Sequence, residues 1–375
     1  MPLLQNLGPA LAVLGGSVKI LPAVGGAVEF LQRPDADEID DGLVNRDLDQ
    51  VNEFAETNPP ARATVNVPVP PVGRQEQHLY RFFLDGSLRT YFLGTGIERN
   101  RDFPIMLAQI GASCVHRRDD GTLTLFSHRT RILLLLPKGG NGVSDDVWET
   151  LSRLNTPDGS FVVQDVNEVT SHTGGREIEL RMRAGGIARH RMHLLEIELI
   201  NSTDKDRSTG SWAILDGAVK LDQFINKPHL VGVAKSFSKK PEFHIGAGAR
   251  AVDVTGLLAG LDYAHRTPAF ASHWGKVAFW YVRLWEQKEL DYPLMGVVKV
   301  ELPTPDTQPA DTELVNELSR ALVAERSVTP YGQDRRWHCH LYPIYCAERA
   351  IKEQFMSQEV LMGHVRWGTP PSSRG

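Results

Sequence analysis

The sequence has little cysteine and no excess of positive charge. Its 375 residues include three cysteines, Cys114, Cys339 and Cys346, and none of them forms a Cys-x-x-Cys pair. This argues against a disulfide-rich scaffold and a zinc knuckle, and it is typical of a reducing compartment. The formal net charge is −5. No global basic field therefore indicates nucleic acid binding, although a local basic groove would be enough for it.

The sequence also lacks an uninterrupted apolar run and a phosphate-binding loop. Residues 2–31 are mostly apolar, but Lys19, Pro22 and two Gly-Gly pairs interrupt them, and no basic segment precedes them. We therefore expect neither a signal peptide nor a membrane span, and we expect a cytoplasmic protein. The loop at 137–142 lacks the Gly-Lys-Ser/Thr ending of a P-loop, so ATP hydrolysis by that route is not expected.

Composition divides the chain near residue 73. Residues 1–31 are predicted to form one or two helices, broken near Gly15-Gly16 and Gly25-Gly26, and residues 33–56 are acidic. Prolines between positions 59 and 71 mark an extended connector. We expect a helical N-terminal segment with an acidic, Pro-rich linker at 1–73, followed by one domain at 74–375.

Apolar runs and turn residues predict an α/β fold with a mixed sheet flanked by helices. Three successive strands joined by short turns suggest an antiparallel meander, whose first member is either one strand or two that turn at Asp85-Gly86. Later strands alternate with helices. The expected strands are 79–93, 104–118, 121–136, 212–216, 230–237, 279–285 and 296–302, and the expected helices are 145–154, 176–201, 311–324 and 344–355.

Two stretches far apart in the sequence share an apolar strand that runs into Leu-Asp-Gly. They contain Asp85-Gly86 and Asp216-Gly217. Taken singly, each Asp-Gly pair is typical of a turn. If the two strands lie side by side in one sheet, however, Asp85 and Asp216 meet on rigid supports. Their oxygens would suit Mn²⁺ or Mg²⁺, and two-metal phosphodiester chemistry needs several such carboxylates.

A third acid is expected from the helix that precedes the second of these strands. Glu196 and Glu198 both qualify, and the apolar stripe from Ala188 to Leu199 leaves Glu196 slightly nearer its centre. We favour Glu196 and keep Glu198 as the alternative metal ligand. Otherwise both are ordinary solvent-facing acids, which is the usual state of glutamate.

A fourth acid, Glu348, lies on the apolar face of the last predicted helix, four residues after Ile344 and three before Ile351. A carboxylate at such a position is costly unless it is paired or bound to a metal. The alternative is an ion pair with Lys352 at the edge of the stripe. His338-Cys339-His340 has metal-ligand spacing, but no matching second pair accompanies it, so a structural role is expected there.

Lys235 ends an apolar run and is a candidate for contact with a substrate phosphate, as a point charge beside the metal ions. The alternative is a lysine at a strand end that reaches solvent.

The order and spacing of these elements resemble the NurA nucleases, which have a ribonuclease H-like fold. The matching pieces, which span residues 80–356, are Leu84-Asp85-Gly86-Ser87, a Glu-bearing helix before Leu215-Asp216-Gly217, Gly232-Val233-Ala234-Lys235-Ser236, and Tyr342-Pro343 with Ala347. The resemblance implies Asp85, Asp216 and one helical Glu as Mn²⁺ ligands. It also implies Tyr342 near the site and Lys235 close to DNA.

The chain departs from the family pattern at one position, where Glu348 follows Ala347 in place of a histidine. A carboxylate is also a ligand for hard metals, so activity is still expected, with a different metal preference and pH dependence. The resemblance further implies a homodimer that docks on a hexameric HerA-type ATPase. The missing P-loop agrees with an ATPase on another chain, and the apolar N-terminal segment is a candidate docking element.

We therefore expect a Mn²⁺- or Mg²⁺-dependent DNA nuclease that acts in DNA end processing or phage defence. The catalytic set would be Asp85, Glu196, Asp216 and Glu348. The alternative is a ribonuclease H-like adaptor that binds DNA or a partner without cutting. An Argonaute-like domain is a third possibility, but no guide-binding module is evident.

Overall fold

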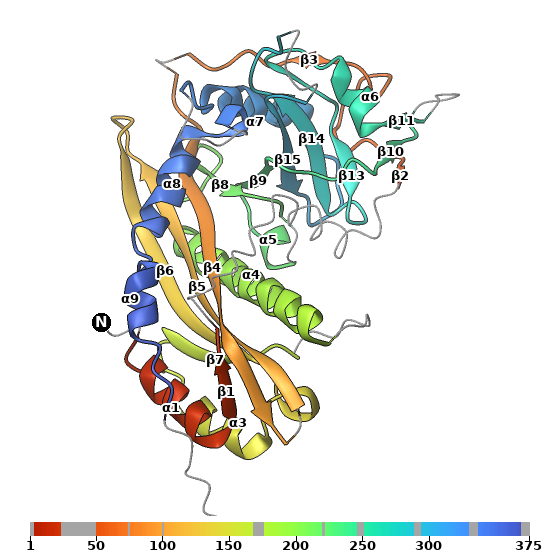
Figure 1. The fold of residues 1–375 in the computed structure, drawn as a ribbon. Coiled ribbons are helices and arrows are strands. Elements are labelled where there is room, and N and C mark those ends of the chain that lie inside the picture. Colours follow the sequence, from red (N-terminus) through yellow and green to blue (C-terminus); the bar gives the residue numbers. More distant parts are fainter. Residues whose placement is uncertain are drawn as a thin grey trace, which may run out of the picture.

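The computed structural model describes residues 4–23, 50–73, 76–99, 101–167, 176–219, 222–245, 251–288, 294–329 and 337–368. Three long strands run the length of the molecule (Figure 1), namely β4 (Tyr80–Glu98), β5 (Arg101–Arg117) and β6 (Leu123–Leu136). They connect a lobe that contains most of the remaining strands to an end that contains the N-terminal helix.

One mixed sheet holds most of the strands. Its order is β3-β12-β14-β15-β9-β8-β4-β5-β6-β7, with β4, β5 and β6 antiparallel, and with β8 and β9 parallel to β4. This confirms the predicted α/β fold with a mixed sheet. The other strands of this path are β3 (Val67–Pro68), β7 (Phe161–Asp165), β8 (Trp212–Asp216), β9 (Leu230–Ala234), β12 (His265–Arg266), β14 (Val277–Arg283) and β15 (Val297–Pro303).

The smaller elements complete the lobe around this sheet. A second sheet joins β2, β10 and β11, and β13 extends the first sheet beside β14. Their bounds are β2 (Gln50–Val51), β10 (Glu242–Phe243), β11 (Val252–Asp253), β13 (Phe270–Ser272), α5 (Asp222–Ile225) and α6 (Val254–Ala259), with 3-10 turns η3 (Gly139–Asn141) and η4 (Trp337–Cys339).

Strand β4 passes straight through Asp85-Gly86. Asp85 pairs with Ser113 of β5 and Gly86 with Ala112, and the ladder is regular from Phe82 to Phe92. The alternative of two strands turning at Asp85-Gly86 is therefore wrong. In a turn, the backbone groups near Asp85 and Gly86 would have formed hydrogen bonds with each other. Here they pair with the neighbouring strand β5 instead.

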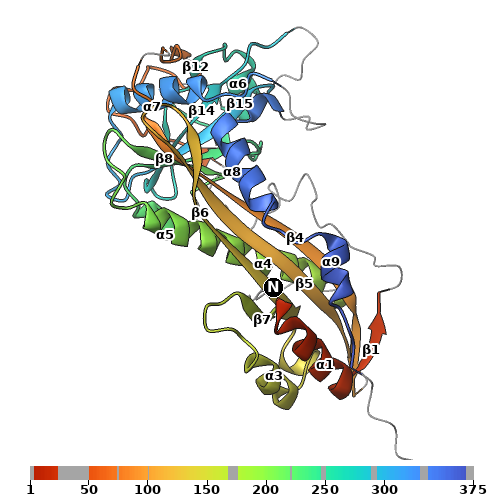
Figure 2. The ribbon, with the colours of Figure 1, turned by 90° about the vertical axis from the view of Figure 1, so that its left-hand side faces the viewer.

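Helices cover both faces of the sheet (Figure 2). The helix α4 (Arg176–Ser202) lies on one face, where its buried side chains contact Leu84 and Leu215. The opposite face carries α7 (Thr312–Ala324) and α8 (Tyr342–Lys352), which contact Phe83 and Ile214. Because successive strand residues point to opposite faces, β4 presents alternate residues to the two helical layers.

The N-terminal segment is part helix and part strand. The helix α1 (Leu7–Ser17) continues through Gly15-Gly16, and β1 (Lys19–Pro22) then pairs antiparallel with the end of β4. The prediction of helix at 19–22 is therefore wrong, because the free edge of β4 offers backbone partners to this stretch. Gly25-Gly26 and most of the acidic stretch lie outside the described residues.

The helix α1 packs on the distal end of the long strands, together with α3 (Asp145–Ser152) and α9 (Gln358–Gly363). Gly15 allows a close approach there, since a Cβ at this position would lie 2.6 Å from the backbone nitrogen of Gly368. No helix among the described residues is long and apolar enough to cross a membrane.

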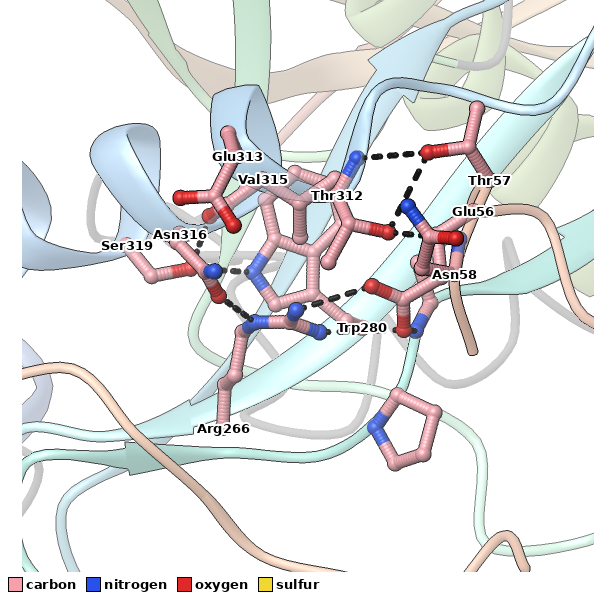
Figure 3. A network of polar contacts seen from close by, with 12 residues as sticks. Glu56, Thr57, Asn58, Arg266, Trp280, Thr312, Glu313, Val315, Asn316 and Ser319 are labelled. Atoms are coloured by element: carbon pink, nitrogen blue, oxygen red, sulfur yellow. Dashed lines mark hydrogen bonds and ion pairs between the residues drawn. The ribbon is translucent and has the colours of Figure 1, made fainter. Parts of the chain in front are cut away.

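A buried ion pair ties the connector before β4 to the sheet (Figure 3). The guanidinium of Arg266 is fully buried and donates to Glu56 Oε2 at 2.8 Å and to Glu56 Oε1 at 3.1 Å. It also donates to Asn316 Oδ1 of α7 at 2.8 Å, and Glu56 accepts from the backbone N–H of Ala269. Each charge is thus neutralised and hydrogen-bonded, which a buried ion pair requires.

We expect Glu56→Gln to lower the free energy of unfolding by about 3–5 kcal/mol, because it leaves the Arg266 guanidinium buried without its counter-charge. Urea denaturation measures this. Glu353→Gln is the matched control, since Glu353 pairs with Arg349 at the surface and should leave stability nearly unchanged. Similar losses of unfolding free energy in Glu56→Gln and Glu353→Gln would contradict a stabilising role for the buried Glu56–Arg266 pair.

Candidate functional site

The structure places Asp85 and Asp216 side by side. The parallel pairing of β4 with β8 ends at Leu84 and Leu215, and the next residue on each strand is the aspartate. Beyond this point β8 ends while β4 continues to Glu98. From the two aspartates onward β4 and β8 are no longer paired, and we call this point the split between β4 and β8. Side chains from the helices on both faces of the sheet can approach the aspartates there.

Asp85 faces α8. Its partner across the ladder, Ser113, donates its hydroxyl to the backbone carbonyl of Ala347 in α8 at 2.7 Å, and opposed residues of an antiparallel pair share a face. Gly86 consequently faces α4. Asp85 is only 6% exposed. Burial and neighbouring negative charges both destabilise an ionised carboxylate, and both therefore raise the pKa of Asp85.

The pKa of Asp85 lies well above its ordinary value. Burial is the largest cause, and the neighbouring negative charge of Asp216 is the next. The positive charge of Lys235 opposes them, while Glu348 and Glu196 raise the pKa further. Three acids predicted from other parts of the sequence therefore lie within electrostatic reach of Asp85.

Lys235, which directly follows β9, supplies positive charge to this cluster. Its ammonium donates to Asp216 Oδ2 at 2.7 Å, and its side chain is 11% exposed. Burial acts to lower the pKa of Lys235, but Asp216, Asp85 and Glu348 outweigh it and raise the pKa above the ordinary value. The ammonium is thus charged at any pH of interest. The alternative of a lysine that reaches into solvent is wrong.

Glu196 and Glu198 have different surroundings. Glu196 is buried against β4, and its Oε2 lies 2.7 Å from Nδ1 of His193. Its Oε1 lies 2.6 Å from the place where a Cβ on Gly86 would be. Glu198 is exposed and pairs with Arg131 at 2.6 Å. The structure therefore brings Glu196, and not Glu198, to the acid cluster, since two positions along a helix separate their directions.

Glu348 combines the two roles considered for it. Lys352 donates to its carboxylate across one helical turn, as an i,i+4 pair. Glu348 also lies within electrostatic reach of Asp85 and Lys235. Burial acts to raise the pKa of Glu348, but Lys352, Lys235 and His340 outweigh it and hold the pKa below the ordinary value. Glu348 is therefore an ionised carboxylate at the edge of the cluster.

Tyr342 is the first residue of α8. Six positions separate it from Glu348, so the two side chains leave α8 on different sides. Tyr342 is 48% exposed and lines a groove of about 560 Å³ together with Val115, Leu125 and Cys346. In the His338-Cys339-His340 segment the thiol of Cys339 is buried and contacts the carbonyl of Val297.

The donor set fits a hard divalent cation in number and kind, since it consists of carboxylates. Among the described residues, however, no three His, Cys, Asp or Glu side chains are already arranged around one ion position. Three of the acids are instead engaged by neighbours, as Asp216–Lys235, Glu348–Lys352 and Glu196–His193. A bound ion would replace or rearrange these contacts.

Sequence reasoning overlooked His193 as part of the site. The only signal was its spacing, three residues before Glu196 on one helix, which brings the two side chains together. The role of Gly86 in admitting Glu196 was also hidden, because it depends on the packing of α4 on β4.

Gly86→Ala tests the close approach of Glu196 to β4. The added Cβ would lie 2.6 Å from Glu196 Oε1 and 2.9 Å from Met192 Sδ, so the ends of these two buried side chains must move away from β4, and this overpacking lowers the free energy of unfolding by about 1 kcal/mol. Thermal unfolding measures it. Gly186→Ala in α4 meets no atom within 4 Å, and this control should stabilise the protein by about 0.5–1 kcal/mol. A neutral or stabilising Gly86→Ala would contradict the packing.

Asp85→Asn should stabilise the protein at neutral pH. The pKa of Asp85 is raised in the folded protein, so the folded state holds this proton more tightly than the unfolded chain and loses stability as the pH rises above about 4. Asparagine removes that loss. Unfolding midpoints followed from pH 3 to pH 8 should separate progressively in favour of Asp85→Asn, and should agree at pH 3. A variant less stable than wild type at pH 7 would refute the raised pKa.

No protein-family model matches the sequence, and no curated protein is significantly similar to it.

Proposed function

We propose that this chain is a metal-dependent deoxyribonuclease with a ribonuclease H-like catalytic core. The observation that carries the proposal is the convergence of Asp85, Asp216, Glu348 and Glu196 at the split between β4 and β8, with Lys235 among them. Buried acids are normally kept apart, so such a cluster is typical of a site that binds cations.

The sheet supports the ribonuclease H-like part of the proposal. Its core order is β6-β5-β4-β8-β9, in which an antiparallel meander is followed laterally by two parallel strands, and α4 lies between the meander and β8 in the chain. This plan resembles the ribonuclease H-like fold. Asp85 is on β4, the edge strand of the meander, and Asp216 ends the neighbouring parallel strand β8.

The four carboxylates would hold Mn²⁺ or Mg²⁺. A pair of such ions activates a water molecule for in-line attack on a phosphodiester and stabilises the leaving oxygen. Asp85 and Asp216 are held rigidly by the two strands, and Glu196 and Glu348 approach from opposite faces of the sheet. Lys235 would offset negative charge on the phosphate of the substrate.

The partners proposed are those that the NurA resemblance implies. They are DNA, a hexameric HerA-type ATPase on a separate chain, and a second copy of this chain in a homodimer. The pathway would be DNA end processing or phage defence in the cytoplasm. The absence of a P-loop ending in the sequence supports a separate ATPase.

A second candidate is an adaptor that binds DNA or a partner without cutting. The observation that favours it is the engagement of Asp216, Glu348 and Glu196 by Lys235, Lys352 and His193. If these contacts persist in the presence of metal ions, the acids form a structural charge network.

Cleavage of end-labelled linear DNA with Mn²⁺ tests the nuclease, with and without the cognate ATPase and ATP. We expect Asp85→Asn, Asp216→Asn, Glu196→Gln and Glu348→Gln each to lose more than about 100-fold in rate, since metal ligands matter more than the groups that orient them. Glu198→Gln is the matched control, because it changes an exposed acid of the same helix.

Equal losses of cleavage rate in Glu196→Gln and Glu198→Gln would contradict the assignment of Glu196 as a metal ligand. Full activity in Glu348→Gln would remove Glu348 from the site and leave the other three acids. A wild-type protein that never cuts, even with the ATPase present, would favour the adaptor.

A further inference from the structure

Lys235 interacts with three of the four acids of the cluster. Its ammonium is hydrogen-bonded to Asp216 at 2.7 Å and interacts electrostatically with Asp85 and Glu348 as well. These three acids are the ones that would ligate a metal ion under the function proposed above. The side chains of Lys235 and Asp216 are only 11% and 18% exposed, so water screens the pair weakly.

A divalent ion and this ammonium compete for the same oxygen. Carboxylates ligate Mn²⁺ and Mg²⁺ through the lone pairs that accept a hydrogen bond from lysine. Two cations held a few ångströms apart in a partly buried site also repel each other strongly. An ion bound by Asp216 Oδ2 therefore requires the ammonium to leave that oxygen.

The backbone of Lys235 is held in place, whereas its side chain is long and flexible. It directly follows β9, whose last residue, Ala234, is fixed in the sheet by pairing with Lys299 of β15. The backbone of Lys235 is thus anchored at the edge of the site, whereas four methylene groups let its ammonium swing. A compact point charge on such a stem can exchange one anionic partner for another.

We propose that Lys235 is the internal counter-ion of the metal-free site. Its ammonium takes the place of the divalent ion among Asp216, Asp85 and Glu348, and binding of the ion displaces it toward the phosphate of the substrate. This inference rests on the proposed metal-dependent nuclease. It adds that Lys235 opposes metal binding in the absence of DNA and favours phosphate binding once the metal is present.

A purely structural lysine makes the opposite prediction for metal affinity. If Lys235 only holds the acids in place, its removal disorders them and weakens metal binding. If Lys235 competes with the ion, its removal strengthens metal binding. The sign of the change therefore separates the two roles.

The test is titration of the full chain with Mn²⁺ alone, in the absence of DNA, by isothermal titration calorimetry. We expect Lys235→Met to bind Mn²⁺ about tenfold more tightly than wild type. Lys235→Arg keeps the charge and should stay within about threefold of wild type. Lys227→Met is the matched control, because Lys227 pairs with Asp204 outside the cluster and should leave Mn²⁺ affinity unchanged.

A second readout follows the other half of the exchange. With Mn²⁺ present, a short DNA that carries slowly hydrolysed phosphorothioate linkages should bind Lys235→Met more weakly than wild type. Equal or weaker Mn²⁺ binding by Lys235→Met, while the wild type binds Mn²⁺, would overturn the counter-ion role and leave the metal site standing. Failure of every variant and of the wild type to bind Mn²⁺ would overturn the proposed function itself.

Removal of this lysine also leaves Asp216, Asp85 and Glu348 without its charge, so folding must be monitored. Thermal unfolding of Lys235→Met should show a larger rise in midpoint on addition of Mn²⁺ than wild type does, because the ion restores the missing positive charge. If Lys235→Met does not fold, Lys235→Gln retains a hydrogen-bond donor without the charge and gives the same comparison.

Discussion

The mutual repulsion of buried carboxylates at the end of β8 is the constraint on which the rest of the site depends. Asp85 and Asp216 are adjacent because parallel strands in register carry them there, and their low exposure weakens the screening by water. A sheet is rigid enough to hold such groups against their repulsion. The observed compensation is the ammonium of Lys235, and the arrangement is one that a divalent cation would stabilise further.

The architecture gives the cluster access from two sides. Because β8 ends at Asp216 while β4 continues, α4 and α8 reach the split between β4 and β8 from opposite faces of the sheet. Gly86 provides the space for Glu196 on the α4 side. On the α8 side, a hydroxyl of Ser113 fixes the helix backbone one residue before Glu348.

A buried ion pair fixes where α8 begins. Arg117 of β5 donates to both carboxylate oxygens of Glu325, which directly follows α7, and Arg117 also donates to the carbonyl of Tyr80. The backbone carbonyl of Glu325 in turn accepts from the N–H of Tyr342, the first residue of α8. The orientation of Glu348 toward Asp85 thus depends on contacts that lie outside the cluster.

Local sequence patterns predicted most of the helices and strands, whereas the remaining features depend on contacts between residues that are distant in the sequence. The strands of the meander and the long helix follow from apolar periodicity and turn residues, and the structure confirms them. The order of β8 beside β4 was a hypothesis from the repeated Leu-Asp-Gly pattern. The strand at 19–22 was not accessible from local patterns, and these patterns left one strand and two strands through Asp85-Gly86 as open alternatives, because each outcome depends on a neighbouring strand that is distant in the sequence.

Among the site residues, helical periodicity separated Glu196 from Glu198 only weakly, whereas packing on Gly86 separates them clearly. The partner of Glu348, Lys352, was expected from i,i+4 spacing. Lys235 was expected beside the metal ions as a phosphate contact, but its ion pair with Asp216 required the tertiary structure, since it depends on β8 and β9 lying side by side.

The most direct test of the acid cluster as a cation site is a crystal structure of the protein grown with Mn²⁺, with anomalous scattering recorded at the manganese edge. The account predicts an anomalous peak between Asp85, Asp216 and Glu348, with the Lys235 ammonium no longer bonded to Asp216. A map with no manganese at these acids, and with the Lys235–Asp216 pair intact at saturating Mn²⁺, would contradict it.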